Sequence, residues 1–359
     1  MIPNDTRTRL PVKFRLMRSP PRSELFSVGR PGDPRLGEWA VAIDEAPGPA
    51  PLHTVILLGC PDDTGVIRNR GRAGAREGPD AIRRHLYKMT PPMDFAWESR
   101  IRLLDAGNVV PGRDIEETHA RARQAASSLA RNGATLVLLG GGHDFAAPGF
   151  SGVFDAQRRR ARSSRGGLIN LDPHLDMRPR EGNLPHSGTP FRDLLESNTL
   201  SGADLVAWGA RACRNSRASY QFATKNGVRV VQFEKIRRGR PAAAQAFASE
   251  LARLARGRSW LGVTVDIDCC ADAEGASAAP VMGFTAWELA EAGRHAGAEA
   301  RVVYFEIAEV APSLEPSERS ARIAAEILMG FLRARAELPP PRTPRSAKTK
   351  QNERKTEHA

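Results

Sequence analysis

The chain has 359 residues and a formal net charge of +12. A chain of this length can bury a large core without disulfides, and it contains no run of ~18 apolar residues that could span a bilayer. Most of the positive charge lies at the ends, because residues 1–30 and 339–359 together carry thirteen Lys or Arg against four Asp or Glu. We therefore expect neither a nucleic-acid-binding protein nor a membrane protein.

The composition divides the chain into three parts. Residues 1–30 form a basic N-terminal arm, which we expect to be partly disordered; a transit peptide and an over-extended start are alternative interpretations. Residues 31–338 form a single domain, and residues 339–359 form a basic tail without large apolar residues, which we expect to be disordered. The four cysteines show neither a paired framework nor a C-x-x-C zinc spacing, which is typical of reduced thiols in a cytoplasmic protein: Cys60, Cys213, Cys269 and Cys270.

From residue 54 onward, short apolar runs rich in Val, Ile and Leu alternate with longer helical patterns. Apolar residues follow one another without alternation in these runs, which predicts strands buried on both faces, as in a parallel sheet covered by helices. The eight predicted strands are 54–60, 101–107, 134–140, 167–172, 204–209, 228–233, 260–268 and 301–307.

The stretches between the strands carry the apolar spacing of helices. No repeat and no Pro/Ser-rich break divides residues 54–337, so we predict one three-layer α/β domain with a mainly parallel eight-stranded sheet and helices on both faces. The Arg-rich stretch 158–165 is interpreted as a solvated loop. The helices singled out by their spacing are 78–89, 114–133, 241–256, 285–297 and 315–337.

Polar side chains gather at the ends of four predicted strands. Ligands of open α/β sheets bind beyond the carboxyl ends of the strands, so these side chains are the candidates for a functional site. They are His143 and Asp144 after the third strand, Asp172, His174 and Asp176 after the fourth, Asp266 and Asp268 at the end of the seventh, and Glu309 after the eighth.

The spacing of two within these groups predicts a metal site. Side chains two apart on an extended backbone point to the same side, so Asp172, His174 and Asp176 face one volume, as do Asp266 and Asp268. Several aspartates in a low-dielectric site repel one another and need cations. Carboxylates and imidazoles without thiolate favour Mn²⁺ and similar ions, and six ligands suffice for two ions that share carboxylates and generate a hydroxide.

Simpler interpretations exist for each residue alone. A single Asp at a strand end is usually a helix cap or turn former, and a single His is usually a core residue. Cys269 and Cys270 are interpreted as small packed residues rather than ligands. The metal hypothesis rests on all six residues together.

The motifs resemble those of the ureohydrolase family of arginases and agmatinases, and they are most similar to its formimidoylglutamase branch. The resemblance covers roughly residues 25 to 335 and rests on GGGHD (140–144), DPHLD (172–176), DID (266–268) and FEIAEVAP (305–312). The stretches 63–86 and 187–196 point to the formimidoylglutamase branch. The resemblance implies an arginase-like fold, two Mn²⁺ ions per chain and cleavage of a C–N bond in an amidine or guanidine.

The resemblance also implies roles for single residues. Asp172 and Asp266 would bridge the two ions, Asp176 would hold the bridging hydroxide and pass its proton to the leaving nitrogen, and Glu309 would pair with the cationic amidinium. His186 is a candidate proton shuttle, because arginase-like members carry a histidine where this chain has Ser187. The implied metal ligands are His143, Asp172, His174, Asp176, Asp266 and Asp268.

The chain departs from the family pattern at several positions. Pro173, Glu306 and Ala311 stand where the family usually has Ala, Asp and Asn. The loop over 269–280 lacks a Pro-Gly that the family carries and is shorter by about two residues, so the pocket that selects the substrate is altered.

The candidate metal ligands and the family resemblance together predict a dimanganese hydrolase. It would convert N-formimidoyl-L-glutamate to formamide and L-glutamate by attack of a hydroxide that bridges the ions. Arg72, Arg178 and Arg211 are candidates to bind the two carboxylates of the glutamate moiety. The alternatives are a ureohydrolase that releases urea from a guanidino acid or an agmatine-like substrate, and a metal-binding member without turnover. We expect a cytoplasmic homo-oligomer.

Overall fold

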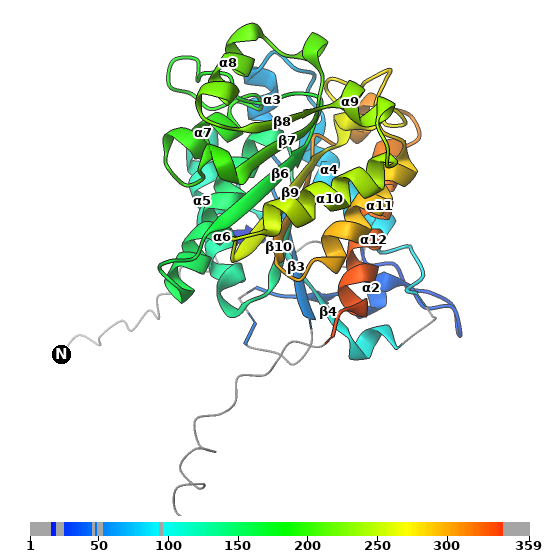
Figure 1. The fold of residues 1–359 in the computed structure, drawn as a ribbon. Helices are drawn as coiled ribbons and strands as arrows, with labels where there is room; N and C mark the ends of the chain where they lie inside the picture. The colour runs from blue at the N-terminus through cyan, green and yellow to red at the C-terminus, as the bar shows by residue number, and fades with distance from the viewer. Residues whose placement is uncertain (1–15, 19–24, 45–46, 49–52, 93–95, 340–359) are drawn as a thin grey trace, which may run out of the picture.

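The computed structural model describes residues 16–18, 25–44, 47–48, 53–92 and 96–339. Most of the predicted N-terminal arm and the predicted tail from residue 340 onward lie outside these residues. Ten strands form one sheet, and helices cover both of its faces (Figure 1). The strands are β1 (Met17–Arg18), β2 (Val41–Ala42), β3 (His53–Gly59), β4 (Ile101–Val109), β5 (Thr135–Leu139), β6 (Gly166–Leu171), β7 (Leu205–Ala210), β8 (Arg229–Gln232), β9 (Trp260–Asp266) and β10 (Val302–Ala308).

The strand order is β1-β4-β3-β5-β10-β9-β6-β7-β8, with β2 pairing to β4 off this path. The pairs from β4 to β8 and the β2 pair are parallel, and only β1 runs antiparallel to its neighbour β4 within the described residues. The three-layer α/β prediction is confirmed, and the eight predicted strands are β3 to β10. The strands β1 and β2 were not predicted, because two residues are too few to show a periodic pattern.

Alternate residues of each central strand belong to different core clusters, one on each face of the sheet. In β3, Val55 and Leu57 pack into one cluster, whereas Ile56 and Leu58 pack into the other. Figure 1 shows α5, α6 and α7 on one side of the sheet and α10, α11 and α12 on the other. The longer helices are α4 (Gly78–Leu86), α5 (Ile115–Leu129), α6 (Ala146–Arg160), α7 (Pro190–Glu196), α8 (Arg217–Lys225), α10 (Ala243–Ala255), α11 (Ala286–Ala298) and α12 (Arg319–Glu337); α2 (Leu36–Trp39), α3 (Thr64–Arg68) and α9 (Phe233–Arg238) are short.

Side-chain caps set the starts of two predicted helices. The Asp114 side chain accepts a hydrogen bond from the Glu117 amide at the start of α5, and Thr285 and Glu288 form a capping box at the start of α11. The last helix begins at Arg319 rather than at the predicted residue 315, because residues 315–318 form a turn and Glu318 has a left-handed backbone with a φ of +49°. Among the described residues, no helix has the length and apolarity needed to cross a membrane.

Candidate metal centre

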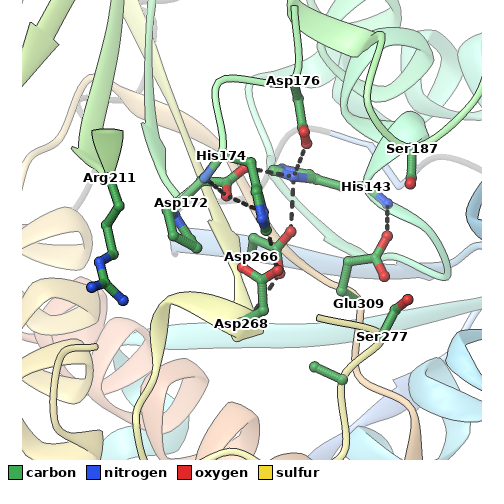
Figure 2. Close-up of polar contacts among 12 residues, drawn as sticks. His143, Asp172, His174, Asp176, Ser187, Arg211, Asp266, Asp268, Ser277 and Glu309 are labelled. Carbon is green, nitrogen blue, oxygen red and sulfur yellow. Dashed lines mark hydrogen bonds and ion pairs between the residues drawn. The ribbon is translucent and has the colours of Figure 1, made fainter. Parts of the chain in front are cut away.

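The candidate site lies where four neighbouring strands end. The strands β5, β10, β9 and β6 are adjacent in the middle of the sheet, and parallel strands place their carboxyl ends at one edge. The 3₁₀ turn His143–Phe145 follows β5, Asp172 follows β6, Asp266 ends β9, and Glu309 follows β10. Figure 2 shows these side chains pointing toward one another. The order of the strands in the sheet therefore brings together residues up to 166 positions apart in the sequence.

The first group of possible ligands surrounds His143. Its Nδ1 atom lies 3.2 Å from an Asp172 oxygen, 3.1 Å from an Asp176 oxygen and 3.3 Å from an Asp266 oxygen. These four residues offer ligand atoms that all lie within 4.8 Å of one another. A single metal ion fits such a group.

A second group lies next to the first and shares two of its members. The Nδ1 atom of His174 lies 3.4 Å from Asp172 Oδ1 and 3.2 Å from Asp268 Oδ2. Together with Asp266, these residues again offer ligand atoms within 4.8 Å of one another. Because Asp172 and Asp266 belong to both groups, two ions could share their carboxylates.

The backbone holds these ligands in tight turns. The Asp172 carboxylate accepts a hydrogen bond from the His174 amide, and the Asp266 carboxylate accepts one from the Asp268 amide. Asp176 and Glu309 have φ angles of +48° and +65°, in the left-handed region that non-glycine residues rarely adopt. Such strain gathers at functional sites.

Burial makes three of the carboxylates, those of Asp176, Asp266 and Asp268, hard to ionise. Burial and the charges of Asp268 and Asp172 raise the pKa of Asp266 to about 8, and burial and the charge of Asp172 raise the pKa of Asp176 to about 7. Burial alone would lower the pKa of His143, but Asp172, Asp176 and Asp266 raise it well above its ordinary value. The centre therefore holds more negative charge than its surroundings compensate, and a divalent cation supplies what is missing.

Two buried atoms point to the same conclusion. His143 Nδ1 and Asp268 Oδ1 have no hydrogen-bond partner among the described residues, although both are buried. Buried polar atoms normally make hydrogen bonds, so these two atoms are available to bind a metal ion. Carboxylate and imidazole donors without thiolate suit manganese. The residues present therefore fit a pair of manganese ions.

One further residue, Thr264, contacts His143 on the side of the ring away from the carboxylates. The Nε2 atom of His143 lies 2.9 Å from the Thr264 hydroxyl, and Thr264 pairs in register with Glu306 on β10. The Tyr304 hydroxyl donates to Glu306 over 2.9 Å, and burial raises the pKa of Glu306 to about 7. Sequence reasoning missed Thr264, although it stands two residues before Asp266 and so faces the same side of β9.

Glu309 closes one side of the centre. Its Oε1 atom accepts a hydrogen bond from the His143 amide at 2.9 Å, and burial and the charge of Asp266 raise its pKa well above its ordinary value. Ser277, Ala278 and Glu309 line a cavity of about 250 Å³, which the candidate metal ligands His174, Asp176, Asp266 and Asp268 also line.

The predicted substrate-binding arginines lie in different places. Arg178 lines the cavity, whereas Arg72 and Arg211 are not among the described residues that line it. The Arg72 guanidinium donates to the carbonyls of Ala276 and Ser277, and that of Arg211 donates to the carbonyl of Met282. Arg211 stands apart from the carboxylates in Figure 2. The roles of these arginines stay predictions.

Ser187 lines the cavity, but the neighbouring His186 does not. His186 is buried, its Nδ1 atom accepts a hydrogen bond from the Gly188 amide at 3.2 Å, and its Nε2 atom lies 3.3 Å from the Pro179 carbonyl. Burial lowers its pKa. Its role as a proton shuttle stays a prediction.

Comparison with known proteins connects this geometry to a family. The model of the arginase family matches residues 53–333. A formimidoylglutamase of Corynebacterium efficiens is 33% identical over 312 residues, which cover 84% of this chain and 92% of that protein.

Solved structures agree with the sequence comparison. Formiminoglutamase of Trypanosoma cruzi with two Mn²⁺ ions superposes with a TM-score of 0.71 at 26% identity, over 90% of this chain and 100% of that chain. A formimidoylglutamase of Bacillus subtilis has the same fold, with a TM-score of 0.78 at 23% identity over 87% of this chain and 95% of that chain.

Proposed function

The chain belongs to the arginase family, and we propose that it is a metal-dependent hydrolase that converts N-formimidoyl-L-glutamate to formamide and L-glutamate. The observation that carries this proposal is the pair of ligand groups, which share Asp172 and Asp266 beneath a cavity that Glu309 lines. The formimidoylglutamases and formiminoglutamases among its relatives support this substrate.

The enzyme uses two manganese ions. His143, Asp172, Asp176 and Asp266 would hold one ion, and Asp172, His174, Asp266 and Asp268 would hold the other. When bound, such a pair of ions lowers the pKa of a water molecule and supplies a hydroxide at neutral pH. The protein side chains then orient the substrate and move protons.

Glu309 positions the reacting end of the substrate. Its carboxylate lines the cavity beside the ligands and is held in place by the His143 amide. A planar amidinium binds a carboxylate through two parallel hydrogen bonds, which fixes its plane and presents its carbon to the attacking hydroxide. The pairing also keeps the amidine protonated and therefore electrophilic.

Asp176 carries the proton. Its carboxylate lines the cavity and faces His143 Nδ1, so it borders both the metal ligands and the space where the substrate binds. It would accept the proton that the attacking hydroxide gives up and donate it to the leaving nitrogen. The C–N bond then breaks to give formamide and the free amine of glutamate.

A product assay combined with metal analysis tests the proposal. Protein loaded with Mn²⁺ should contain two ions per chain and release formamide from N-formimidoyl-L-glutamate, while a panel of guanidino acids and agmatine releases no urea. Release of urea from a compound of that panel would show that the substrate is a guanidine and not N-formimidoyl-L-glutamate. Absence of turnover on all these compounds would leave a metal-binding protein.

We also propose that the chain acts as a homo-oligomer in the cytosol. Three large apolar side chains close together in the sequence are exposed: Val281, Met282 and Trp287. Exposed apolar side chains of this size commonly mark a protein interface.

The four cysteines are free thiols, in keeping with a reducing compartment. Light scattering coupled to gel filtration measures the number of chains, and a monomer would contradict the oligomer.

A further inference from the structure

The lining of the cavity carries charges of both signs. The metal ligands and Glu309 form its acidic floor, and three arginines from different segments of the chain also line it: Arg70, Arg178 and Arg214. None of the three guanidiniums pairs with a carboxylate among the described residues, and only Arg178 makes a side-chain hydrogen bond, to Asn69 Oδ1 at 3.2 Å. The cavity therefore offers unpaired cations to whatever binds above the floor.

The neighbouring arginines behave differently. Arg68 lies 3.2 Å from Glu116, and Arg180 lies 2.8 Å from Asp193. Arg72 is engaged by the carbonyls of the loop that carries Ser277. Arg70, Arg178 and Arg214 therefore differ from these three neighbours, whose guanidiniums are engaged.

The backbone fixes the loops on which the three arginines stand. Arg70 has a φ of +62°, and the next residue, Gly71, packs so closely that an added Cβ would lie 2.4 Å from Ser277 Oγ. The Arg178 amide donates to the Gly188 carbonyl. Beside Arg214, the Asn215 side chain donates to the Pro173 carbonyl and accepts from the Leu175 amide. Anchored loops present these guanidiniums at little entropic cost.

The three arginines form two groups by their neighbours, and we call these groups the two walls of the cavity. Asn69, the neighbour of Arg70, holds Arg178, so Arg70 and Arg178 share one wall. Arg214 belongs to the other wall, together with Ser216 and Ser219 at the start of α8, where Ser216 caps the helix. The N-terminus of a helix adds positive potential to the Arg214 wall.

A balance of charge indicates the ligand. Two divalent ions would compensate the four aspartates of the centre, and the amidinium of a substrate would compensate Glu309. The guanidiniums then remain, and they match carboxylates, which arginine binds bidentately. An agmatine-like substrate, which lacks a carboxylate, leaves them unmatched.

We propose that Arg70 and Arg178 bind one carboxylate of the substrate and that Arg214, with the start of α8, binds the other. This inference rests on the proposed function and adds to it that the site selects dicarboxylate amidines through a clamp with two walls. Arg70 and Arg214 are residues that sequence reasoning did not single out. Arg70 stands in a turn and Arg214 ends the three-residue 3₁₀ helix Ala212–Arg214, and both segments are too short for a periodic pattern to show the direction of a side chain.

The clamp is tested by measuring the kinetic constants of arginine variants on the substrate and on analogues that lack one carboxylate. The variants Arg70→Gln, Arg178→Gln and Arg214→Gln should each lower kcat/KM for N-formimidoyl-L-glutamate roughly tenfold to a hundredfold, mainly through KM, because each removes charge-assisted hydrogen bonds. Arg131→Gln is the matched control, since Arg131 is exposed in the turn before β5, at the opposite edge of the sheet, and is not among the described residues that line the cavity. It should leave both constants unchanged.

Two analogues assign the walls. N-formimidoyl-4-aminobutyrate lacks the α-carboxylate, and N-formimidoyl-2-aminobutyrate lacks the γ-carboxylate. A variant should have nearly the same kcat/KM as the wild type on the analogue that lacks the carboxylate bound by the substituted arginine. Arg70→Gln and Arg178→Gln should therefore match the wild type on one analogue, and Arg214→Gln should match it on the other. Equal losses on all three substrates, or no loss in any variant, would overturn the clamp.

Folding and the proposed function are checked separately. Manganese content and melting temperature of each variant should equal those of the wild type, and Arg→Lys variants at the same positions, which keep the charge, should recover part of the affinity. A wild-type enzyme that releases no formamide from N-formimidoyl-L-glutamate contradicts the proposed function. A wild-type enzyme that does so, with variants that match it, contradicts only the clamp.

Discussion

The Nε2 atom of His143 lies 2.9 Å from the hydroxyl oxygen of Thr264, on the side of the ring opposite to the carboxylates that Nδ1 faces. A ligating histidine binds metal through an unprotonated nitrogen, so the other nitrogen carries the proton and needs an acceptor. Thr264 provides this acceptor. A proton on Nε2 that Thr264 accepts leaves Nδ1 free for a metal ion.

Removal of the Thr264 hydroxyl should weaken binding of one ion. Thr264→Val keeps the shape of the side chain and leaves the Nε2 proton unsatisfied, so manganese affinity at the His143 group should fall roughly tenfold to a hundredfold. Titration calorimetry measures the affinity, and electron paramagnetic resonance reports the loss of coupling between two Mn²⁺ ions. Thr264→Ser, which keeps the hydroxyl, should bind like the wild type, and equal binding by Thr264→Val would exclude this role.

Asp172 should be needed for both ions. Its Oδ2 atom lies 3.2 Å from His143 Nδ1, and its Oδ1 atom lies 3.4 Å from His174 Nδ1, so one carboxylate spans both ligand groups. Asp172→Asn removes the negative charge and replaces one carboxylate oxygen with an amide nitrogen that cannot bind a cation. We expect fewer than two manganese ions per chain by elemental analysis, together with loss of most activity.

The control for this variant is another buried aspartate. Asp204 is 4% exposed and pairs with Arg165 and Arg258, away from the centre. Asp204→Asn should lower stability but keep two ions per chain. An Asp172→Asn protein with full metal content and full activity would refute the proposed bridging role.

The sequence alone predicted the sheet and the acidic floor of the site because both follow from regular geometry. Continuous apolar runs identified the eight longer strands, and the spacing of two in Asp172, His174 and Asp176 predicted side chains on one side. The carboxyl ends of adjacent parallel strands then had to meet. No knowledge of the loops was needed for these steps.

The cavity wall could not be predicted in the same way. Arg70 and Arg72 are two positions apart, yet only Arg70 lines the cavity while Arg72 donates to the carbonyl of Ala276. The difference arises from the left-handed backbone at Arg70 and from the packing of Gly71 against Ser277, which are long-range effects. Likewise, Thr264 became recognisable only when its hydroxyl was seen beside His143.

The metal-free protein should lose stability as the pH rises. Asp266 and Asp176 have an ordinary pKa of 3.8, which burial and neighbouring carboxylates raise to about 8 and about 7, and the pKa values of His143 and His174 are raised well above 6.5. All four groups bind more protons in the folded than in the unfolded chain. Their contribution to the free energy of unfolding is therefore largest at low pH and is lost as the pH rises through the folded pKa values.

Chemical unfolding at several pH values measures this effect. Between pH ~5 and ~8, the free energy of unfolding of chelator-treated protein should fall by at least ~2 kcal/mol relative to Asp176→Asn, in which one titrating group is absent. Saturating Mn²⁺ should remove most of this difference, because the ions replace the bound protons. Identical pH slopes for the two metal-free proteins would argue against the raised pKa of Asp176.

Glu309 should be needed for catalysis but not for metal binding. Its carboxylate accepts a hydrogen bond from the His143 amide and lines the cavity, yet it belongs to neither ligand group. Glu309→Gln keeps the shape of the side chain and removes the charge that would pair with an amidinium. The expected result is a loss in kcat/KM of roughly a hundredfold to a thousandfold with two manganese ions still bound, because an electrostatic contact to the reacting group is lost. Glu326→Gln, on the exposed face of α12, should behave like the wild type, and a Glu309→Gln protein that loses its metal would assign Glu309 to the ligand set instead.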